Sequence, residues 1–471
     1  MQKIFNSNIF DQPAFWMLVS GLFALSITLS AVFGISAWLL LAGILFILSL
    51  ILLVKRPFLL LCLLIIARMS LDYSAEYFTF TFFDISISLS QLLGIGVAIL
   101  GIINIITHRK ALWNFQLSVP FLILFLWGSF TLTYSLASYS TLYELLRLFD
   151  LFALGFLAYT AIQKTADFKK LLLTFFISGI LPTAFAIYQW VLGIGIQDEA
   201  FSVPRIFGTF SHPNVFSLYL FSLIVFACLY FLVFVRAPHP NQIQTNLSPK
   251  ELLLLGLLGV LALMLFFTYA RVAWIALFVF AFLLSLFRFR KLLIPLIILP
   301  LVLFTFSQNF QERVLESFTR RPDSSIVWRQ NLWHDVVTNS IQDGNFWLGS
   351  GMNTFPLVSE NLRGISFGSN DPHNDFVKFF VEGGALGLAV YVLYLISISF
   401  ILLKNYFHNR EQPPLHLAFF ILILFFFTLE LASLSDNVFK NTPVLWLFFI
   451  ALSGLLALAQ KEKLTFISDK K

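Results

Sequence analysis

The sequence predicts an all-α membrane protein that crosses the lipid bilayer many times. Of its 471 residues, 59% are hydrophobic and only 11% are charged, whereas soluble domains carry about a quarter charged residues. The chain holds 58 phenylalanines and 23 glycines, a balance that suits broad lipid-facing helix surfaces better than a packed aqueous core. Because a water-soluble fold cannot hide this much apolar surface, we expect lipid around most of the chain.

Apolar runs long enough to cross a bilayer core, at about 20 residues per span, recur along the whole chain. They predict fourteen spans near 14–33, 35–54, 57–71, 85–106, 118–135, 145–162, 168–192, 214–236, 251–269, 271–288, 291–307, 378–404, 415–434 and 442–460. The run at 57–71 is short enough for a half-span, and over-splitting would lower the total. The predicted fold class is therefore an all-α polytopic membrane protein with about 12–14 transmembrane helices.

The positions of Lys and Arg in the short loops predict the orientation. Seven basic clusters fall on one side when the spans alternate, and they lie at 55–56, 108–110, 164–170, 236–250, 288–291, 404–410 and 461–471. We expect that side to be the cytoplasm, with both termini inside and the other loops outside. The net charge of +6 is then a topology signal, not a sign of nucleic-acid binding. No small-residue cleavage site follows the first apolar run, so we expect no cleaved signal peptide.

One outer loop differs from the rest in length. Residues 308–377 hold many of the charges of the chain, and structureless loops longer than about 15 residues are uncommon unless they are functional. Apolar residues at helical spacing over 325–340 predict an amphipathic helix on the outer membrane surface, with Trp328 and Trp333 as interfacial belt residues. The chain accordingly divides into N-terminal spans, central spans, the large loop, and C-terminal spans with a tail: 1–135, 136–307, 308–377 and 378–471.

Three polar sites stand where the outward end of a span begins, at 204–214, 268–271 and 370–375. At the first site we expect Ser211 as N-cap with Pro213 in the first turn. At the third we expect Asp371 as N-cap with Pro372 as the first helical residue. The dipole-positive ends of the three helices would then face outward, where they attract anions.

Two arginines and a histidine at these sites indicate chemistry on an anionic ligand. Arg271 in a first helical turn is unfavourable unless an anion lies beside it, and Arg205 can join it in a clamp on a diphosphate. The same dipole favours the neutral form of His373, which is the form that a general base requires.

Simpler interpretations stand beside this one. Arg205 and Arg271 can be snorkelling anchors at the membrane interface, and His373 can be a solvent-exposed or structural histidine. A metal site at 371–375 is disfavoured, because one His and two carboxylates on adjacent residues cannot all point at one ion. His212 is expected to be a capping neighbour and not a catalyst.

Charged residues also occur within the spans. Glu144, Arg147 and Asp150 share one helix face, and Arg68 and Asp72 are spaced four residues apart. Intramembrane ionisable residues are functional candidates by default, but internal ion pairs are the simpler interpretation here.

The order and spacing of these motifs resemble the O-antigen ligase and O-antigen polymerase family of bacterial membrane glycosyltransferases. The matching stretches are Arg205-Ile-Phe-Gly-Thr-Phe-Ser-His-Pro-Asn214, Thr268-Tyr-Ala-Arg271, Trp328-Arg329 with Trp333, Leu348-Gly-Ser-Gly351 with Phe355, and His373-Asn374 with Glu382-Gly-Gly-Ala-Leu-Gly387. The resemblance covers roughly residues 140–460.

The resemblance implies a metal-independent glycosyltransferase without cofactors, in the bacterial cytoplasmic (inner) membrane and with an extracytoplasmic active site. A glycan linked to a polyprenyl diphosphate, such as undecaprenyl diphosphate, would pass to a glycan, glycolipid or protein acceptor, as when O-antigen joins lipopolysaccharide. His373 would be the general base, and Arg205, Arg271, Arg329 and Asn374 would bind the substrate.

Two alternatives remain open at this stage. A polymerase of surface polysaccharide differs from a ligase only in its acceptor, and these residues do not decide between them. A secondary transporter or lipid flippase would place charges near the bilayer midplane, on broken helices in paired halves. The sharpest polar clusters of this chain lie instead at the outer helix ends, which favours the glycosyltransferase.

Overall fold

The computed structural model describes residues 37–72, 79–82, 85–198, 201–236, 248–316, 318, 325–364 and 370–468, and most of them are helical. The helices are α2 (Ala37–Lys55), α3 (Pro57–Leu71), α5 (Leu89–Thr107), α6 (Arg109–Leu112), α7 (Ser118–Thr131), α8 (Ser138–Ala161), α9 (Thr165–Leu192), α10 (Pro213–Tyr230), η2 (Phe231–Arg236), α11 (Pro249–Phe267), α12 (Arg271–Phe287), η3 (Arg290–Leu292), α13 (Leu293–Phe306), α14 (Gln308–Leu315), α15 (Ser325–Gln342), α16 (Phe355–Arg363), α17 (Asp375–His408), α18 (Pro413–Ala432) and α19 (Thr442–Ser468). Two antiparallel hairpins join β1 (Thr79–Phe82) to β2 (Ile85–Ser88) and β3 (Ile196–Asp198) to β4 (Phe201–Arg205). The predicted all-α polytopic fold class is confirmed.

Seven of the described helices are long and apolar enough to cross a membrane, namely α5, α9, α10 with η2, α11, α17, α18 and α19. A pair bent by 101°, 290–306 with 308–315, is an eighth candidate if counted as one span. Every predicted span from 35–54 onward has a helix at its position, although 85–106 begins as strand β2. The span predicted at 14–33 lies outside the described residues, so the total of fourteen stays a prediction.

The chain divides into two compact units at Leu60, within α3. In the second unit, residues 61–471, α19 and α10 are the most enclosed spans, with 94% and 72% of their apolar stretches buried. These two helices form the centre of the unit, and the candidate site lies wholly within it.

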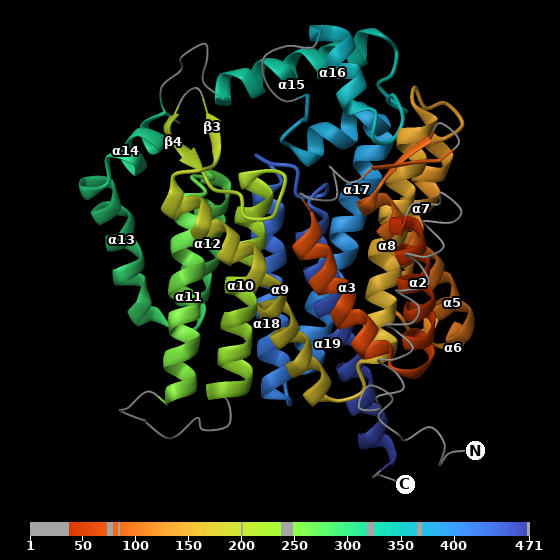
Figure 1. Ribbon diagram of the computed structural model, residues 1–471, viewed down its shortest axis with the longest axis vertical. Coiled ribbons are helices and arrows are strands. Elements are labelled where there is room, and N and C mark those ends of the chain that lie inside the picture. Colours follow the sequence, from red (N-terminus) through yellow and green to blue (C-terminus); the bar gives the residue numbers. More distant parts are fainter. Residues whose placement is uncertain are drawn as a thin grey trace. The chain divides into compact units, whose positions relative to one another are not determined.

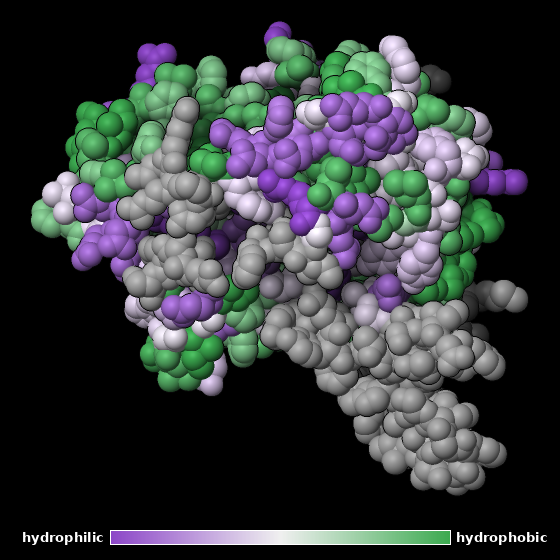
Figure 2. All heavy atoms as spheres, turned by 90° about the horizontal axis from the view of Figure 1, so that it is seen from above, coloured by the Kyte–Doolittle hydropathy of each residue, from purple (hydrophilic) through white to green (hydrophobic). Residues whose placement is uncertain are grey.

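Within the second unit, the connections between helices gather at two opposite ends (Figure 1). One end carries the β3–β4 hairpin together with α14, α15 and α16, and we call it the site end. Viewed from above this end, hydrophilic residues gather in the middle of the face and hydrophobic residues toward its edges (Figure 2). At the opposite end, Lys461 Nζ donates to Ile162 O at 2.7 Å and Asn405 Nδ2 donates to Gln116 Oε1 at 2.9 Å. The threading predicts this separation; which end faces the cytoplasm stays a prediction.

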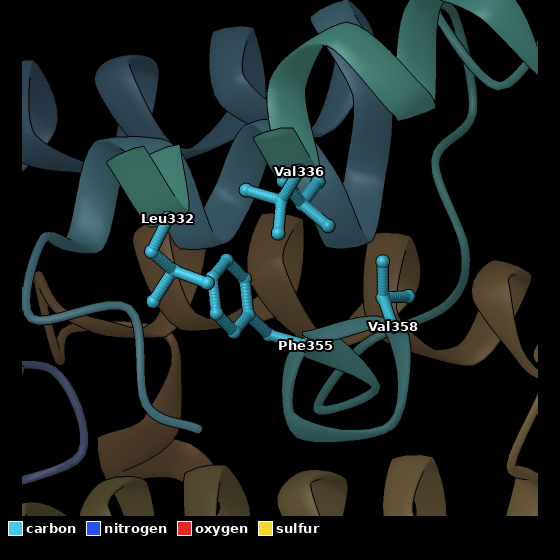
Figure 3. Packing of buried hydrophobic residues seen from close by; sticks show 5 residues of the cluster. Leu332, Val336, Phe355 and Val358 are labelled. Atoms are coloured by element: carbon cyan, nitrogen blue, oxygen red, sulfur yellow. The ribbon is translucent and has the colours of Figure 1, made fainter. Parts of the chain in front are cut away.

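The helix predicted over 325–340 exists, but it packs on protein. Leu332 and Val336 of α15 meet Phe355 and Val358 of α16 in a buried cluster (Figure 3), and Val381 of α17 completes it. Trp328 packs against this cluster, and Trp333 Nε1 donates to Pro372 O at 2.6 Å. The helix predicted here is confirmed, but its apolar face packs on protein. Its place at the outer membrane surface, with two belt tryptophans, stays a prediction.

Two glycine-rich stretches lock the large loop to α17. Ser350 N donates to Val381 O at 3.1 Å, and Gly351 N donates to Glu382 O at 2.8 Å. Gly349 has a φ of +68°, and a Cβ there would lie 2.5 Å from the backbone of Glu382. Only glycine allows both this conformation and this approach. The lock fixes the loop above the helix that follows His373.

Candidate active site

A cavity of about 450 Å³ opens at the site end among α3, α5, α8, α10 and α19. Its charged, histidine and amide lining includes Arg68, Asp72, Arg147, Asp150, His212, Asn214, His373, Asp436, Asn437 and Lys440. The volume lies in the range of small-ligand sites, roughly 300–1,000 Å³. Segments that are distant in sequence therefore meet around one space large enough for a ligand.

His373 reaches this cavity from the turn that precedes α17. Trp333 Nε1 holds the turn through Pro372 O, and Asn374 Nδ2 donates to Leu434 O at 3.1 Å. His373 itself has a φ of +48°, a left-handed conformation that is uncommon for residues other than glycine. The backbone at this position is thus held by contacts from α15 and from the turn after α18.

The predicted start of this helix is wrong. Asn374, and not Asp371, is the N-cap of α17, and its Oδ1 accepts a backbone N–H of the first turn at 3.1 Å. Asp371 is engaged elsewhere, because its Oδ1 accepts from Lys440 Nζ at 2.7 Å. His373 therefore precedes the helix, and the helix-dipole argument for its neutral form loses its basis.

Asp436, in the turn between α18 and α19, lies against His373. The distance from His373 Nδ1 to Asp436 Oδ1 is 3.3 Å. Burial by itself would raise the pKa of Asp436, but the hydrogen bond with His373 and the charges of His373 and Arg329 hold this pKa below its ordinary value. An ionised carboxylate accepts a hydrogen bond from the Nδ1–H group of the imidazole, which leaves the Nε2 lone pair available to a substrate.

Arg205 connects to the same carboxylate through Asn214. Arg205 Nη2 donates to Asn214 Oδ1 at 2.8 Å, and Asn214 Nδ2 donates to Asp436 Oδ2 at 2.8 Å. On its other side, Arg205 Nε donates to Thr268 O at 2.9 Å. Because only 7% of Arg205 is exposed, this residue is a buried bridge and not a snorkelling anchor.

A buried glutamine shapes the turn that follows Arg205. Gln189 Oε1 accepts the backbone N–H groups of Phe207 at 3.0 Å and of Gly208 at 2.9 Å. Gly208 has a φ of +60°, and a Cβ there would lie 2.9 Å from Pro182 O. The turn consequently packs directly on α9, and this contact fixes the position of Arg205 at the end of β4.

His212 caps α10. Its Nδ1 accepts the N–H of Asn214 at 3.1 Å, and Pro213 is the first helical residue. The prediction of Pro213 in the first turn is confirmed, but that of Ser211 as the cap is wrong, because His212 holds the N-cap position. Burial and the charge of Arg205 lower the pKa of His212 to about 4, so this imidazole is neutral at physiological pH.

Arg271 begins α12, as predicted, and it has an anion beside it. Its Nη1 lies 3.5 Å from Glu316 Oε2 at the end of α14. Glu316 also accepts from Arg313 Nη1 at 2.6 Å, and Arg313 Nε donates to Tyr269 O at 3.2 Å. In this structure Glu316 supplies the negative charge that a cation in a first helical turn requires.

Arg329 supports the Asp436 turn from the side of the large loop. Its Nη1 donates to Ser435 O at 2.9 Å, and burial lowers its pKa while the charge of Asp436 opposes that shift. Of the five site residues predicted from the sequence, His373 lines the cavity. Arg205, Arg329 and Asn374 bond the backbone of neighbouring turns. Arg271 pairs with Glu316 and does not line the cavity.

One comparison with known proteins bears on this site. Residues 256–392 match the family model described as O-antigen ligase. The match supports a relation to an O-antigen ligase family over this stretch, which is less than half of the chain. No curated protein matches the chain.

The O-antigen ligase match covers only part of the site. It contains Arg271, Arg329 and His373, whereas Arg205 precedes it and Asp436 follows it. The site is therefore completed by segments on both sides of the matched region. Among the described residues, no group of three or more His, Cys, Asp or Glu side chains is placed to hold a metal ion. Metal independence stays a prediction.

The sequence interpretation overlooked the charged residues of α3 and α8 as part of this site. Arg68 binds Asp72, and Arg147 binds Glu144 at 2.7 Å, so these two predicted pairs are confirmed, whereas Asp150 forms no ion pair among the described residues. Both arginines nevertheless line the cavity that His373 lines. The available signal was that each arginine shares a helix face with a carboxylate near the outer end of a span. The sequence does not show which other segments lie beside these faces.

Proposed function

We propose that this protein transfers a glycan from a polyprenyl diphosphate carrier to an acceptor hydroxyl at the site end. The observation that carries the proposal is the His373–Asp436 pair beside the cavity, joined to buried Arg205 through Asn214. A base, a carboxylate that orients it and a nearby cation are the groups that such a transfer needs.

His373 acts as the general base in this proposal. The acceptor oxygen forms a bond to the anomeric carbon while His373 Nε2 takes the hydroxyl proton. The bond between that carbon and the carrier's diphosphate oxygen breaks, and the diphosphate leaves with the electron pair. Asp436 stabilises the imidazolium that results. General-base catalysis of this kind contributes about 10²–10⁴ in rate.

Arg271 and Arg205 counter the charge that develops on the leaving diphosphate. Fixed cations aimed at developing negative charge stabilise the transition state. Two anions cannot share the position beside Arg271, so the Glu316 carboxylate has to move away when a diphosphate arrives. Arg205 is held in place by Thr268 O and Asn214.

The test is transfer by the purified full chain in lipid nanodiscs, with lipid-linked glycan extracted from cells that lack this protein as donor. We expect His373→Ala to lower the rate by about 10²–10⁴. The matched control is His334→Ala, which changes an exposed histidine of α15 and should stay within about twofold of the parent. Normal transfer by His373→Ala would refute the base assignment, and loss of activity in EDTA that Mg²⁺ restores would refute metal independence.

The acceptor class is tested separately on a gel of surface glycans from a deletion strain. If the protein is a ligase, its deletion leaves the carrier-linked chains intact but abolishes long chains attached to the acceptor. If the protein is a polymerase, its deletion leaves acceptors that carry a single glycan repeat.

A further inference from the structure

Unsatisfied polar atoms concentrate around the cavity. In the described part of the chain, nine buried side-chain N or O atoms have no hydrogen-bond partner. Four of them belong to residues that line this one cavity, and they are Arg147 Nη1, Asp150 Oδ1, Asn437 Oδ1 and Trp446 Nε1. Leaving a buried donor or acceptor unpaired costs stability, and each such group in a native fold asks for an explanation.

These four atoms form a mixed set of two donors and two acceptors. The residues that carry them line the cavity with donor and acceptor groups. Sugar hydroxyl groups both donate and accept, so a sugar matches such a mixed lining. The lining also offers the aromatic rings of Tyr143 and Trp446 beside the polar groups. Apolar faces with a few placed polar groups are the usual construction of a site for a small organic ligand.

A diphosphate fits this cavity poorly. Lys440 is bonded to Asp371, and Arg68 to Asp72. Arg147 is bonded to Glu144. Each of these cations therefore already faces a carboxylate, and an added anion would meet those carboxylates as like charges. The balanced charge favours a neutral, hydroxyl-rich ligand.

We propose that the cavity bounded by Arg147, Asp150, Asn437 and Trp446 is the subsite for the sugar of the acceptor. This rests on the function proposed above and adds the place and the chemical class of the acceptor. His373 lines the same cavity, so a sugar held there has a hydroxyl within reach of the base. The diphosphate then binds on the Arg205–Arg271 side, and the reacting hydroxyl passes between the two regions.

The experiment measures initial rates with the full chain in nanodiscs while donor and acceptor are varied in turn. The donor is the extracted lipid-linked glycan, and the acceptor is the delipidated glycan fraction of the same cells. Trp446→Phe keeps a ring but removes the Nε1 donor, and we expect it to raise the acceptor KM roughly three- to tenfold. Asp150→Asn replaces one carboxyl oxygen with an amide group and should raise this KM roughly three- to tenfold. The donor KM should change by less than about twofold in both variants.

Trp274→Phe is the matched control. Trp274 of α12 also has a buried Nε1 without a partner, but it packs against Phe266 and Phe310 and does not line the cavity. Its acceptor KM should match that of the parent. Methyl glycosides of hexoses and N-acetylhexosamines serve as probes, and they should compete with the acceptor and not with the donor.

Two results would overturn the inference. The first is an acceptor KM that Trp446→Phe and Asp150→Asn leave at the Trp274→Phe value. The second is competition of the methyl glycosides with the donor, which would assign the cavity to the carrier-linked glycan. If His373→Ala and Arg271→Ala abolish transfer while either result is obtained, the acceptor subsite alone is refuted. If those two variants transfer normally, the proposed function itself is refuted.

Discussion

Two polar regions at the site end are built in opposite ways. Around the turn 268–271, both cations have partners: buried Arg205 donates to Thr268 O and Asn214, and half-buried Arg271 faces Glu316. Around the cavity, ion pairs coexist with four buried atoms that have no partner among the described residues. The comparison indicates that the arginines around this turn already have partners and must exchange one to bind an anion. Residues that line the cavity instead carry polar atoms without a partner. His373 and Asp436 stand between the two regions.

The largest effect is expected at this junction. Asp436→Asn removes the charge that stabilises the imidazolium of His373, and we expect kcat to fall by about 10²–10⁴. Asp371→Asn is the control, because Asp371 also lines the cavity but pairs with Lys440 and its side chain is 42% exposed. Steady-state rates in nanodiscs compare the two. Equal rates would show that the carboxylate beside His373 has no special part in the reaction.

The next effect tests the arginine turn. Arg205→Lys keeps the charge but cannot donate to both Thr268 O and Asn214 Oδ1 from one fork, since a lysine ammonium is a point charge on a flexible stem. We expect kcat/KM to fall roughly 10- to 100-fold. Arg363→Lys provides the control, because Arg363 binds Asp335 at 3.0 Å through side chains that are 22% and 43% exposed. Its kcat/KM should remain within about twofold. Full activity in Arg205→Lys would show that the two hydrogen bonds of the Arg205 guanidinium are not needed for transfer.

Sequence reasoning predicted the helices well because the signals for them are local. The run at 57–71 coincides with α3, and 325–340 lies within α15. The prediction of helix caps failed where a side chain binds a residue distant in sequence. Asp371 binds Lys440, which lies 69 residues away, and does not cap α17. The same limit applies to the site. His373 was singled out, but its partner Asp436 lies 63 residues further on, and apolar periodicity does not tell which turns meet at one end of a bundle.

The sequence also predicted wrongly which of the two regions has its charges paired within the protein. Arg271 was expected to await an anion, and the structure gives it Glu316. Arg147 and Asp150 were expected to neutralise one another, yet Arg147 binds Glu144 and Asp150 Oδ1 accepts no bond. Spacing along a helix shows which residues share a face, but rotamers and neighbouring helices decide which of them pair.

A smaller effect tests whether Glu316 occupies the place of a diphosphate. Glu316→Gln removes the negative charge that faces Arg271 and Arg313, so we expect inorganic diphosphate to inhibit transfer at about three- to tenfold lower concentration. Glu312→Gln on the same helix is the control, since the Glu312 carboxylate accepts from Gln308 in a solvent-exposed contact. An unchanged inhibition constant in Glu316→Gln would place the diphosphate away from Arg271.

The smallest effect separates the cavity from a phosphate site. Lys440 and Asp371 are 25% and 42% exposed, and exposed pairs contribute only about 0–1 kcal/mol. Burial by itself opposes both charges, but the pair keeps the pKa of Asp371 below its ordinary value and the pKa of Lys440 above its own. The stability from Asp371 is therefore lost only as pH falls through that lowered pKa, and that from Lys440 only as pH rises through its raised pKa. Between about pH 5 and pH 9 both groups stay charged.

We accordingly expect Lys440→Met to lower the thermal unfolding midpoint in detergent slightly, by an amount that is constant from about pH 5 to pH 9. The donor KM of this variant should change by less than about threefold, because Lys440 already faces a carboxylate. A donor KM raised more than about tenfold would mean that Lys440 binds the diphosphate. The cavity and the arginine turn would then form a single anion site, and the contrast between them would fail.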